Sequence, residues 1–161
     1  MTTNKRQEGF SLIELLIVVA IIGIIAAIAI PNLLASRRAA NEGSAQSSLR
    51  TLHGAEATYQ VSFGNGAFGT LAQLDTADLV DPVLASGTKS GYNIGDPTLI
   101  APAAGVQAQF FTTADPITDS GPSQSGTRTF CITEDGVMRG AVGTTAVANR
   151  AACDAVTALG N

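Results

Sequence analysis

The 161-residue sequence contains few of the residue types that form catalytic, metal or nucleic-acid sites. It has one histidine, two cysteines and no tryptophan, and aromatic residues make up 5% of it. This set gives no ligand cluster with zinc spacing and too few aromatic side chains for a base-stacking platform. There is no phosphate-binding loop and no GxSxG nucleophile motif. The sequence therefore predicts no catalytic residues, no cofactor and no metal site.

Charge is also scarce, because Asp, Glu, Lys and Arg make up 14% of the chain and the formal net charge is −4. A negative net charge gives no overall electrostatic attraction to nucleic acid. Asp75, Asp78 and Asp81 recur at three-residue steps and could share a helical face as a calcium site. Calcium loops, however, need closely spaced oxygen ligands around a sharp turn. We interpret the three aspartates as solvated acids and the single His53 as a surface or interface residue.

A long apolar run near the N-terminus is the most informative feature of the sequence. From Phe10 to Ile30, Glu14 is the only ionisable residue. At ~1.5 Å per helical residue, this run spans roughly 30 Å, the thickness of the hydrocarbon core of a bilayer. Lys5 and Arg6 precede it, and by the positive-inside rule they place the leader in the cytoplasm. The run therefore predicts a single-pass membrane helix whose C-terminal side lies outside the cytoplasm.

The expected cleavage site, Gly9–Phe10, comes before this apolar run. An ordinary secretory signal is cut after its apolar segment, which is then removed. Cleavage after Gly9 would instead leave a mature protein that begins with a hydrophobic helix. Such a chain can wait in a membrane and later be extracted from it.

The stretch EGFSLIEL (residues 8–15), followed by an apolar helix with Gly23 and Pro31, resembles type IV pilins and the pseudopilins of type II secretion. The resemblance implies cleavage after Gly9 by a prepilin peptidase and N-methylation of the new terminal Phe10. It also implies a homo-oligomeric helical filament built on an inner-membrane assembly platform. Before assembly the subunit would lie in inner-membrane lipid, and after assembly in an extracellular pilus. No specific nucleic-acid partner is supported.

Glu14 is an unusual residue for a membrane helix. A carboxylate at the centre of an isolated span costs ~2.5–3.5 kcal/mol on insertion scales, so it rarely persists without a use. In one interpretation it reaches the membrane interface or stays protonated. In the other it pairs with the cationic amine that cleavage creates on Phe10 of a neighbouring subunit. Such a buried pair is costly to break, and it would fix the register of each added subunit.

The helical pattern continues beyond Pro31 to about Phe63, which predicts one helix of roughly 80 Å. An apolar stripe with steps of three or four residues marks its second half. Gly23 and Pro31 are weak points, because proline removes a helical hydrogen bond. We expect either a simple kink or local melting near Pro31 that would let a filament extend. The stripe consists of Ala45, Leu49, Leu52, Ala55, Tyr59 and Phe63, and the opposite, water-exposed face carries Arg50, His53, Glu56 and Gln60.

The remaining sequence predicts an α+β pilin fold, in which about four antiparallel strands cover the amphipathic half of the helix. Asn65, between two glycines, ends the helix, and TLAQL (70–74) forms a short second helix. Residues 114–126 are expected to be an exposed loop. The strands are expected around 92–94 and at 106–113, 127–133 and 137–142, with a turn at 134–136. The domains are a leader (1–9), a transmembrane or filament-core helix (10–31) and an exported domain (32–161).

Cys131 and Cys153 both lie beyond the membrane helix, where an oxidising compartment favours a disulfide over two free thiols. Closing a loop of about 23 residues contributes on the order of 3 kcal/mol in the chain-entropy model. The bridge would attach an otherwise weakly structured tail, residues 140–161, to the domain. The family resemblance makes this the C-terminal disulfide-bounded region of a pilin.

Three functions remain open from the sequence. The first is a type IV pilin for adhesion, twitching motility or DNA uptake, which the length and the cysteine pair favour. The second is a pseudopilin of a type II secretion system, for which a calcium-bound loop would replace the disulfide. The third is a single-pass anchored envelope protein that never polymerises, which leaves Glu14 and the early cleavage site unexplained.

Overall fold

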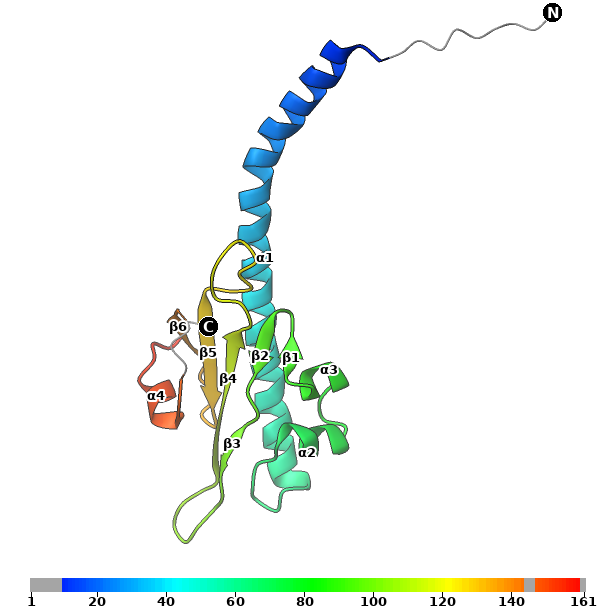
Figure 1. Ribbon diagram of the computed structural model, residues 1–161. Helices are drawn as coiled ribbons and strands as arrows, with labels where there is room; N and C mark the ends of the chain where they lie inside the picture. The colour runs from blue at the N-terminus through cyan, green and yellow to red at the C-terminus, as the bar shows by residue number, and fades with distance from the viewer. Residues whose placement is uncertain (1–9, 144–146, 160–161) are drawn as a thin grey trace, which may run out of the picture. The chain divides into compact units, whose positions relative to one another are not determined.

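The computed structural model describes residues 10–143 and 147–159 (Figure 1). These residues divide into two compact units, with the boundary between Ser36 and Arg37. The first unit holds the apolar part of the long helix α1 (Leu12–Ser62), and the second holds its remainder and all the other elements. We describe each unit by itself.

The end of α1 follows from the sequence, as predicted. Asn65 and Gly66 have φ angles of 50° and 92°, in the left-handed region that glycine and asparagine tolerate. The amide of Gly64 donates to the carbonyl oxygen of Tyr59 at 2.7 Å, which satisfies one of the last helical acceptors. This turn redirects the chain toward the short helix α2 (Leu71–Thr76).

Two short helices follow α1, and side-chain caps start both of them. Thr70 and Gln73 form a capping box at the start of α2, in which each side chain accepts from the backbone of the other residue. Asp81 accepts from the amide of Leu84 at 2.9 Å and caps helix α3 (Pro82–Ala85).

A six-stranded antiparallel sheet forms the body of the second unit. The longest strand, β4, pairs with β5 on one edge and with both β2 and β3 on the other. Strand β1 extends the sheet beyond β2, and β6 closes the other side beyond β5. The strands are β1 (Thr88–Lys89), β2 (Tyr92–Ile94), β3 (Thr98–Ile100), β4 (Gln109–Pro116), β5 (Arg128–Thr133) and β6 (Arg139–Val142).

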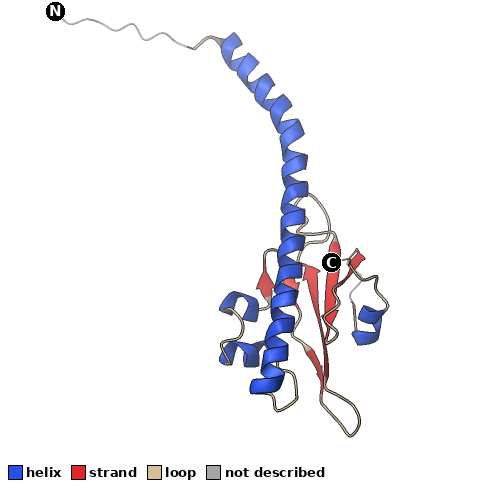
Figure 2. Cartoon of the chain, turned by 180° about the vertical axis from the view of Figure 1, so that it is seen from behind, coloured by secondary structure: helices blue, strands red, loops and turns tan. Residues whose placement is uncertain are grey.

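The second half of α1 lies across one face of this sheet (Figure 2). Alternation along β5 turns Phe130 and Ile132 toward the helix, where they join a buried cluster with Leu49 and Leu52. These four side chains are at most 1% exposed. Full burial of one such side chain contributes about 1.5–3 kcal/mol, so the contact between α1 and the sheet stabilises the body.

The α+β fold predicted from the sequence is confirmed, with corrections in detail. The sheet has six strands rather than about four, because β1 and β3 are too short to show alternation. The strand expected at 106–113 begins and ends three residues later, at Gln109 and Pro116. Residues 114–116 therefore belong to β4 and not to the exposed loop. The strand predicted at 137–142 is β6, which begins two residues later, at Arg139. The tail is more ordered than expected, since it also contains the helix α4 (Arg150–Asp154).

Candidate assembly site

The apolar half of α1 has no apolar partner among the described residues. Every Leu, Ile and Val from Leu12 to Leu33 is exposed, and Phe10 is 84% exposed. By length and composition α1 qualifies as a membrane span, and none of its most apolar window is buried. Continuous apolar surface on this scale requires a lipid or protein environment. The cleavage residue Gly9 lies outside the described residues.

Glu14 occupies the third position of α1 and already has a local partner. Its Oε2 accepts a hydrogen bond from the backbone amide of Ser11 at 3.0 Å. A glutamate that reaches back to the residue before the helix satisfies one of the unpaired amides at the helix start. Its negative charge also suits the positive end of the helix dipole. The sequence reasoning missed this capping role, which a carboxylate three residues after a serine could have revealed.

Gly23 and Pro31 both lie within continuous helix. A Cβ added at Gly23 would meet nothing within 4 Å. The helix continues through Pro31, so the melted alternative is not seen in the isolated chain. Next to the proline, the Asn32 side chain donates to the carbonyl oxygen of Ile28 at 3.1 Å. Extension of this segment in a filament stays a prediction.

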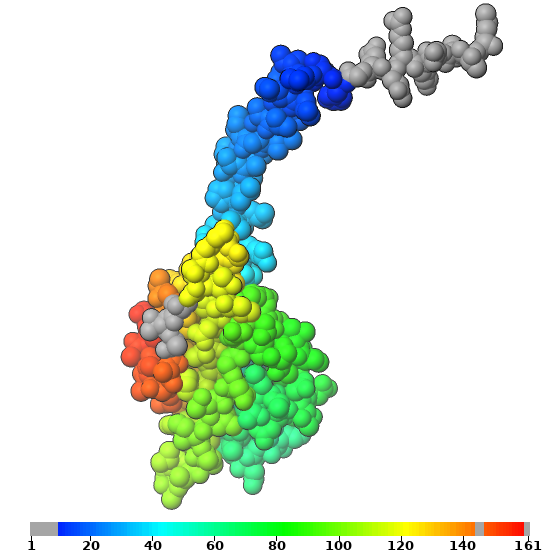
Figure 3. Space-filling view, viewed as in Figure 1, coloured from blue at the N-terminus to red at the C-terminus, as the bar shows by residue number. Residues whose placement is uncertain are grey.

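Cys131 and Cys153 form a disulfide, as expected from the sequence, with Cα atoms 6.0 Å apart. Cys131 lies on β5 between Phe130 and Ile132, so it faces away from α1 and toward the tail. The bridge forms a second small core with Val147, on which Ala152 and Val156 pack. Figure 3 shows this C-terminal segment, in orange and red, packed along one side of the body.

A network of ion pairs holds the same segment on the sheet. Arg150 binds Glu134, with its Nε donating to Oε2 at 3.2 Å. Arg139 binds Asp135 at 2.7 Å, and both arginines also lie within 4 Å of Asp154. Burial by itself raises the pKa of Asp135, but hydrogen bonds from Arg139, Val137 and Thr133 outweigh burial and lower this pKa to about 2. The Arg150–Glu134 pair therefore joins the turn at 134–136 to the tail, while the disulfide joins the tail to β5.

Polar side chains of α1 hold the connection between β4 and β5. Arg38 donates to Gln124, and Asn41 donates to the carbonyl oxygen of Ser125 at 2.8 Å. Glu42 accepts from both the amide and the hydroxyl group of Thr127, at 2.8 and 2.7 Å. The sequence-predicted loop is thus attached to the helix. The bonds of Arg38 and Asn41 join residues that are 86 and 84 positions apart in the sequence, so no local sequence signal reveals them.

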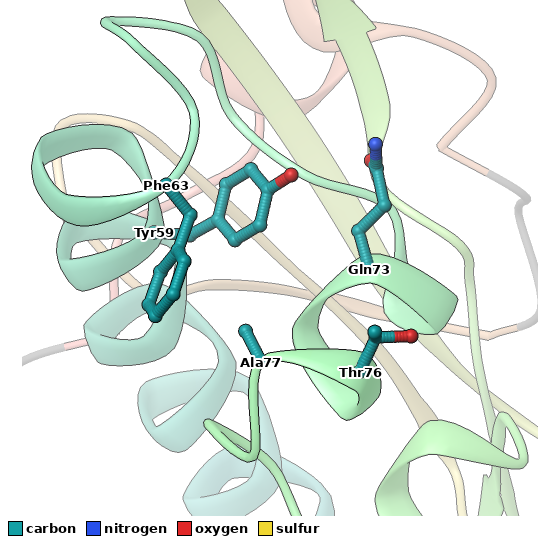
Figure 4. A pocket seen from close by; sticks show the side chains of 5 residues that line it. All are labelled: Tyr59, Phe63, Gln73, Thr76 and Ala77. Carbon is teal, nitrogen blue, oxygen red and sulfur yellow. The ribbon is translucent and has the colours of Figure 1, made fainter.

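An open pocket lies where α1 ends beside α2 (Figure 4). Its volume is about 460 Å³, and the rings of Tyr59 and Phe63 stack at 6.0 Å along one wall. Gln73, Thr76 and Ala77 form the other wall. None of these side chains is a carboxylate, an imidazole or an amine.

The three aspartates do not share a helical face. Asp75 lies in α2, Asp78 follows that helix with a φ of 56°, and Asp81 caps α3. Two hydrogen bonds lower the pKa of Asp81; the bond from the Leu84 amide has the larger effect and the bond from Lys89 the smaller. Among the described residues no group of three or more His, Cys, Asp or Glu side chains could hold a metal ion.

A family model for the prokaryotic N-terminal methylation motif matches residues 4–30. The chain carries a prepilin-type N-terminal segment. This match covers the stretch that contains Gly9, Phe10 and Glu14, and it confirms the resemblance predicted from the sequence.

Relatives from two machineries are similar to part of this chain. The type IV major pilin protein PilA of Myxococcus xanthus is 48% identical over 56 residues, 35% of this chain and 26% of that protein. The type IV wide pilus major component PilA4 of Thermus thermophilus is 63% identical over 38 residues, 24% of this chain and 29% of that protein. The type II secretion system core protein G of Escherichia coli is 31% identical over 96 residues, 57% of this chain and 65% of that protein. The chain thus spans less than two thirds of each relative's length. No solved structure matches.

Proposed function

We propose that this chain is the structural subunit of a type IV pilus. Residues 1–9 act as a cleaved leader, residues 10–31 as a membrane and filament-core helix, and residues 32–161 as the exported domain. The observation that supports this most strongly is the exposed apolar half of α1, which carries one carboxylate, Glu14, within the residues that the methylation-motif model matches. Such a helix is satisfied by lipid before assembly and by neighbouring helices afterwards.

In this proposal Glu14 selects subunits that are in register. Its Oε2 is bonded to the Ser11 amide, while a carboxylate has further lone pairs with which to accept from a second donor. The donor is the amine of a neighbour's Phe10, created by a prepilin peptidase on an inner-membrane platform. In an apolar environment that pair is strong, and an unpaired partner is costly.

The disulfide favours the pilus over the alternative. The Cys131–Cys153 bridge and the ion pairs around Asp154 hold the tail on the sheet. The second candidate is a pseudopilin of a type II secretion system, which the longer similarity to core protein G supports. Deleting the gene separates the two, because loss of surface filaments indicates the pilus and loss of protein secretion indicates the pseudopilin.

Substitutions of Glu14 test the assembly role. We expect Glu14→Leu to be expressed, cleaved and inserted normally, since it removes a charge from the membrane helix, but to give few or no filaments. Glu14→Gln keeps an acceptor for the Ser11 amide without the charge, so it should be intermediate. Glu14→Asp keeps the charge and is the matched control, with more filaments than Glu14→Gln. Filament number and length come from electron microscopy.

Wild-type filaments in the Glu14→Leu strain would refute the proposed role of the carboxylate. If those filaments also lacked this chain, it would be better described as an anchored envelope protein that does not polymerise. If filaments were lost equally in all three variants, assembly would require both the charge and the length of the Glu14 side chain, and charge alone would not decide it.

A further inference from the structure

Glu56 is a carboxyl group in the interior of the second unit, although its helical position predicts exposure to water. The side chain is 0% exposed, whereas His53 and Gln60, assigned to the same face of α1, are half-buried. Its Oε2 accepts from the amide of Gly69 at 2.8 Å. Its Oε1 is buried and has no hydrogen-bond partner among the described residues. An unpaired oxygen of this kind is costly, especially when the group is charged.

Glu56 belongs to a cluster that fixes the connection between α1 and α2. Three successive amides in this connection, at residues 69–71, donate to three different side chains. One acceptor comes from α1, one from α2 and one from the link between β2 and β3. The three bonds are Gly69 N to Glu56 Oε2, Thr70 N to Gln73 Oε1 and Leu71 N to Asp96 Oδ1, each 2.8 Å.

The surroundings of Glu56 oppose a negative charge. Burial raises the pKa of Glu56 to about 7; the Gly69 amide acts in the opposite direction, and the charge of Asp96 raises the pKa further. The negative charge of Asp96, in the link between β2 and β3, is the charge that acts on Glu56 from outside α1. His53, one turn earlier on α1, instead directs its Nε2 to the carbonyl oxygen of Glu134 at 3.4 Å. No described cation pairs with Glu56.

We propose that Glu56 is a proton-operated latch, which keeps the connection between α1 and α2 closed while its carboxyl group is neutral and lets it open when that group ionises. In the closed state the neutral group accepts from Gly69 and adds no charge to the interior. Ionisation of Glu56 places its negative charge near that of Asp96 in the interior. Local opening admits water, which reduces the repulsion between the two charges.

Opening would also change the pocket at the end of α1. The ring of Tyr59 lies against the connection, since a Cβ added at Gly64 or Gly69 would come within 3.0 Å of it. Tyr59 also lines the pocket with Phe63 and Gln73. The latch therefore makes the shape of this apolar pocket depend on pH near neutrality.

Hydrogen exchange on the full chain in detergent micelles tests the latch. We expect the open population of residues 64–71, after correction for the intrinsic exchange rate, to rise about thirtyfold from pH 5.5 to 8.5. This factor follows if the Glu56 carboxyl group ionises near pH 7 while the connection is closed and near its ordinary value of 4.5 while the connection is open. Glu56→Gln, a neutral side chain of the same shape, should remove the pH dependence. The matched control Glu42→Gln removes another α1 carboxylate that binds a backbone amide and should behave like wild type.

A wild-type change below about threefold, or the same change in Glu56→Gln, would overturn the latch. A second measurement does not depend on the folding of that variant. The carbon-13 shift of the Glu56 carboxyl group should titrate near pH 7 in the wild type, and Asp96→Asn should move the midpoint down. A midpoint near the ordinary value of 4.5 contradicts the proposal.

Discussion

The two halves of α1 differ in the exposure of their apolar side chains, which are exposed in the first half and buried in the second. From Leu12 to Leu33 the exposed fractions of Leu, Ile and Val run from 46% to 80%. From Ala45 to Ala55 the apolar stripe is at most 6% exposed, because the sheet covers it. One helix therefore has a first half that must find its apolar environment outside the chain and a second half that finds it inside. This difference is what a subunit that leaves a membrane to join a filament requires.

The largest expected effect concerns the start of the apolar half. Gly9→Val should block cleavage, because a small residue fits the narrow pocket expected of the peptidase. Intact-mass analysis of membrane fractions should then show only the precursor. Gly43→Val is the matched control, since a Cβ there meets nothing within 4 Å, and it should be cleaved normally. Mature protein that starts at methylated Phe10 in the Gly9→Val strain would disprove the assigned site.

Truncating one leucine or isoleucine in each half compares the halves directly. Leu52→Ala leaves a cavity under the sheet and should lower the free energy of unfolding of the body by about 2–5 kcal/mol. Ile22→Ala, at a position 57% exposed, should change it by less than about 0.5 kcal/mol. Urea unfolding in detergent micelles, followed by circular dichroism, measures both. Equal effects would mean that the two halves do not differ as described.

Both cysteines of the disulfide lie in the second unit, so its removal should affect that unit alone. Replacing both Cys131 and Cys153 with serine should cost on the order of 3 kcal/mol, because the unfolded chain loses its constraint. Hydrogen exchange should rise more in residues 147–159 than in α1, where no bridge acts. Alkylation of wild-type protein prepared without reductant is the control. Two freely alkylated cysteines would refute the bridge and favour the pseudopilin.

A smaller effect than that of the disulfide is expected from Asp135→Asn in the turn beside the same region. The carboxyl group of Asp135 is partly exposed, so its pair with Arg139 should be worth less than about 1 kcal/mol and weaken with salt. The folded-state pKa is lowered to about 2 from 3.8, so this contribution is present above pH 4 and disappears toward pH 2. The variant should lack this part of the acid destabilisation in urea titrations from pH 2 to 6. An unchanged acid profile would contradict the pairing.

Much of the fold could be predicted because its signals are local. Helical periodicity marks α1, left-handed residues end it, and alternation marks β5. The strands β1 and β3 were missed because segments of two or three residues carry no periodicity. The helix α4 was missed because the contacts that hold it on the sheet, the Cys131–Cys153 bridge and the ion pairs with Glu134 and Arg139, join residues far apart in the sequence.

The candidate site, too, could be predicted only where its signals are local in the sequence. Phe10 and Glu14 could be singled out because a charge in an apolar run is visible in the sequence itself. The burial of Glu56 could not, because a helical pattern does not reveal that a connection closes over a polar residue. The bonds from α1 to residues 124–127 were missed for the same reason.

The most direct test of the central claim is the mass of the protein in filaments sheared from the cell surface. The filaments should contain this chain starting at N-methylated Phe10, without residues 1–9 and with Cys131 and Cys153 bridged. Filaments that lack the chain, while it stays in the membrane with its first nine residues attached, would contradict the account.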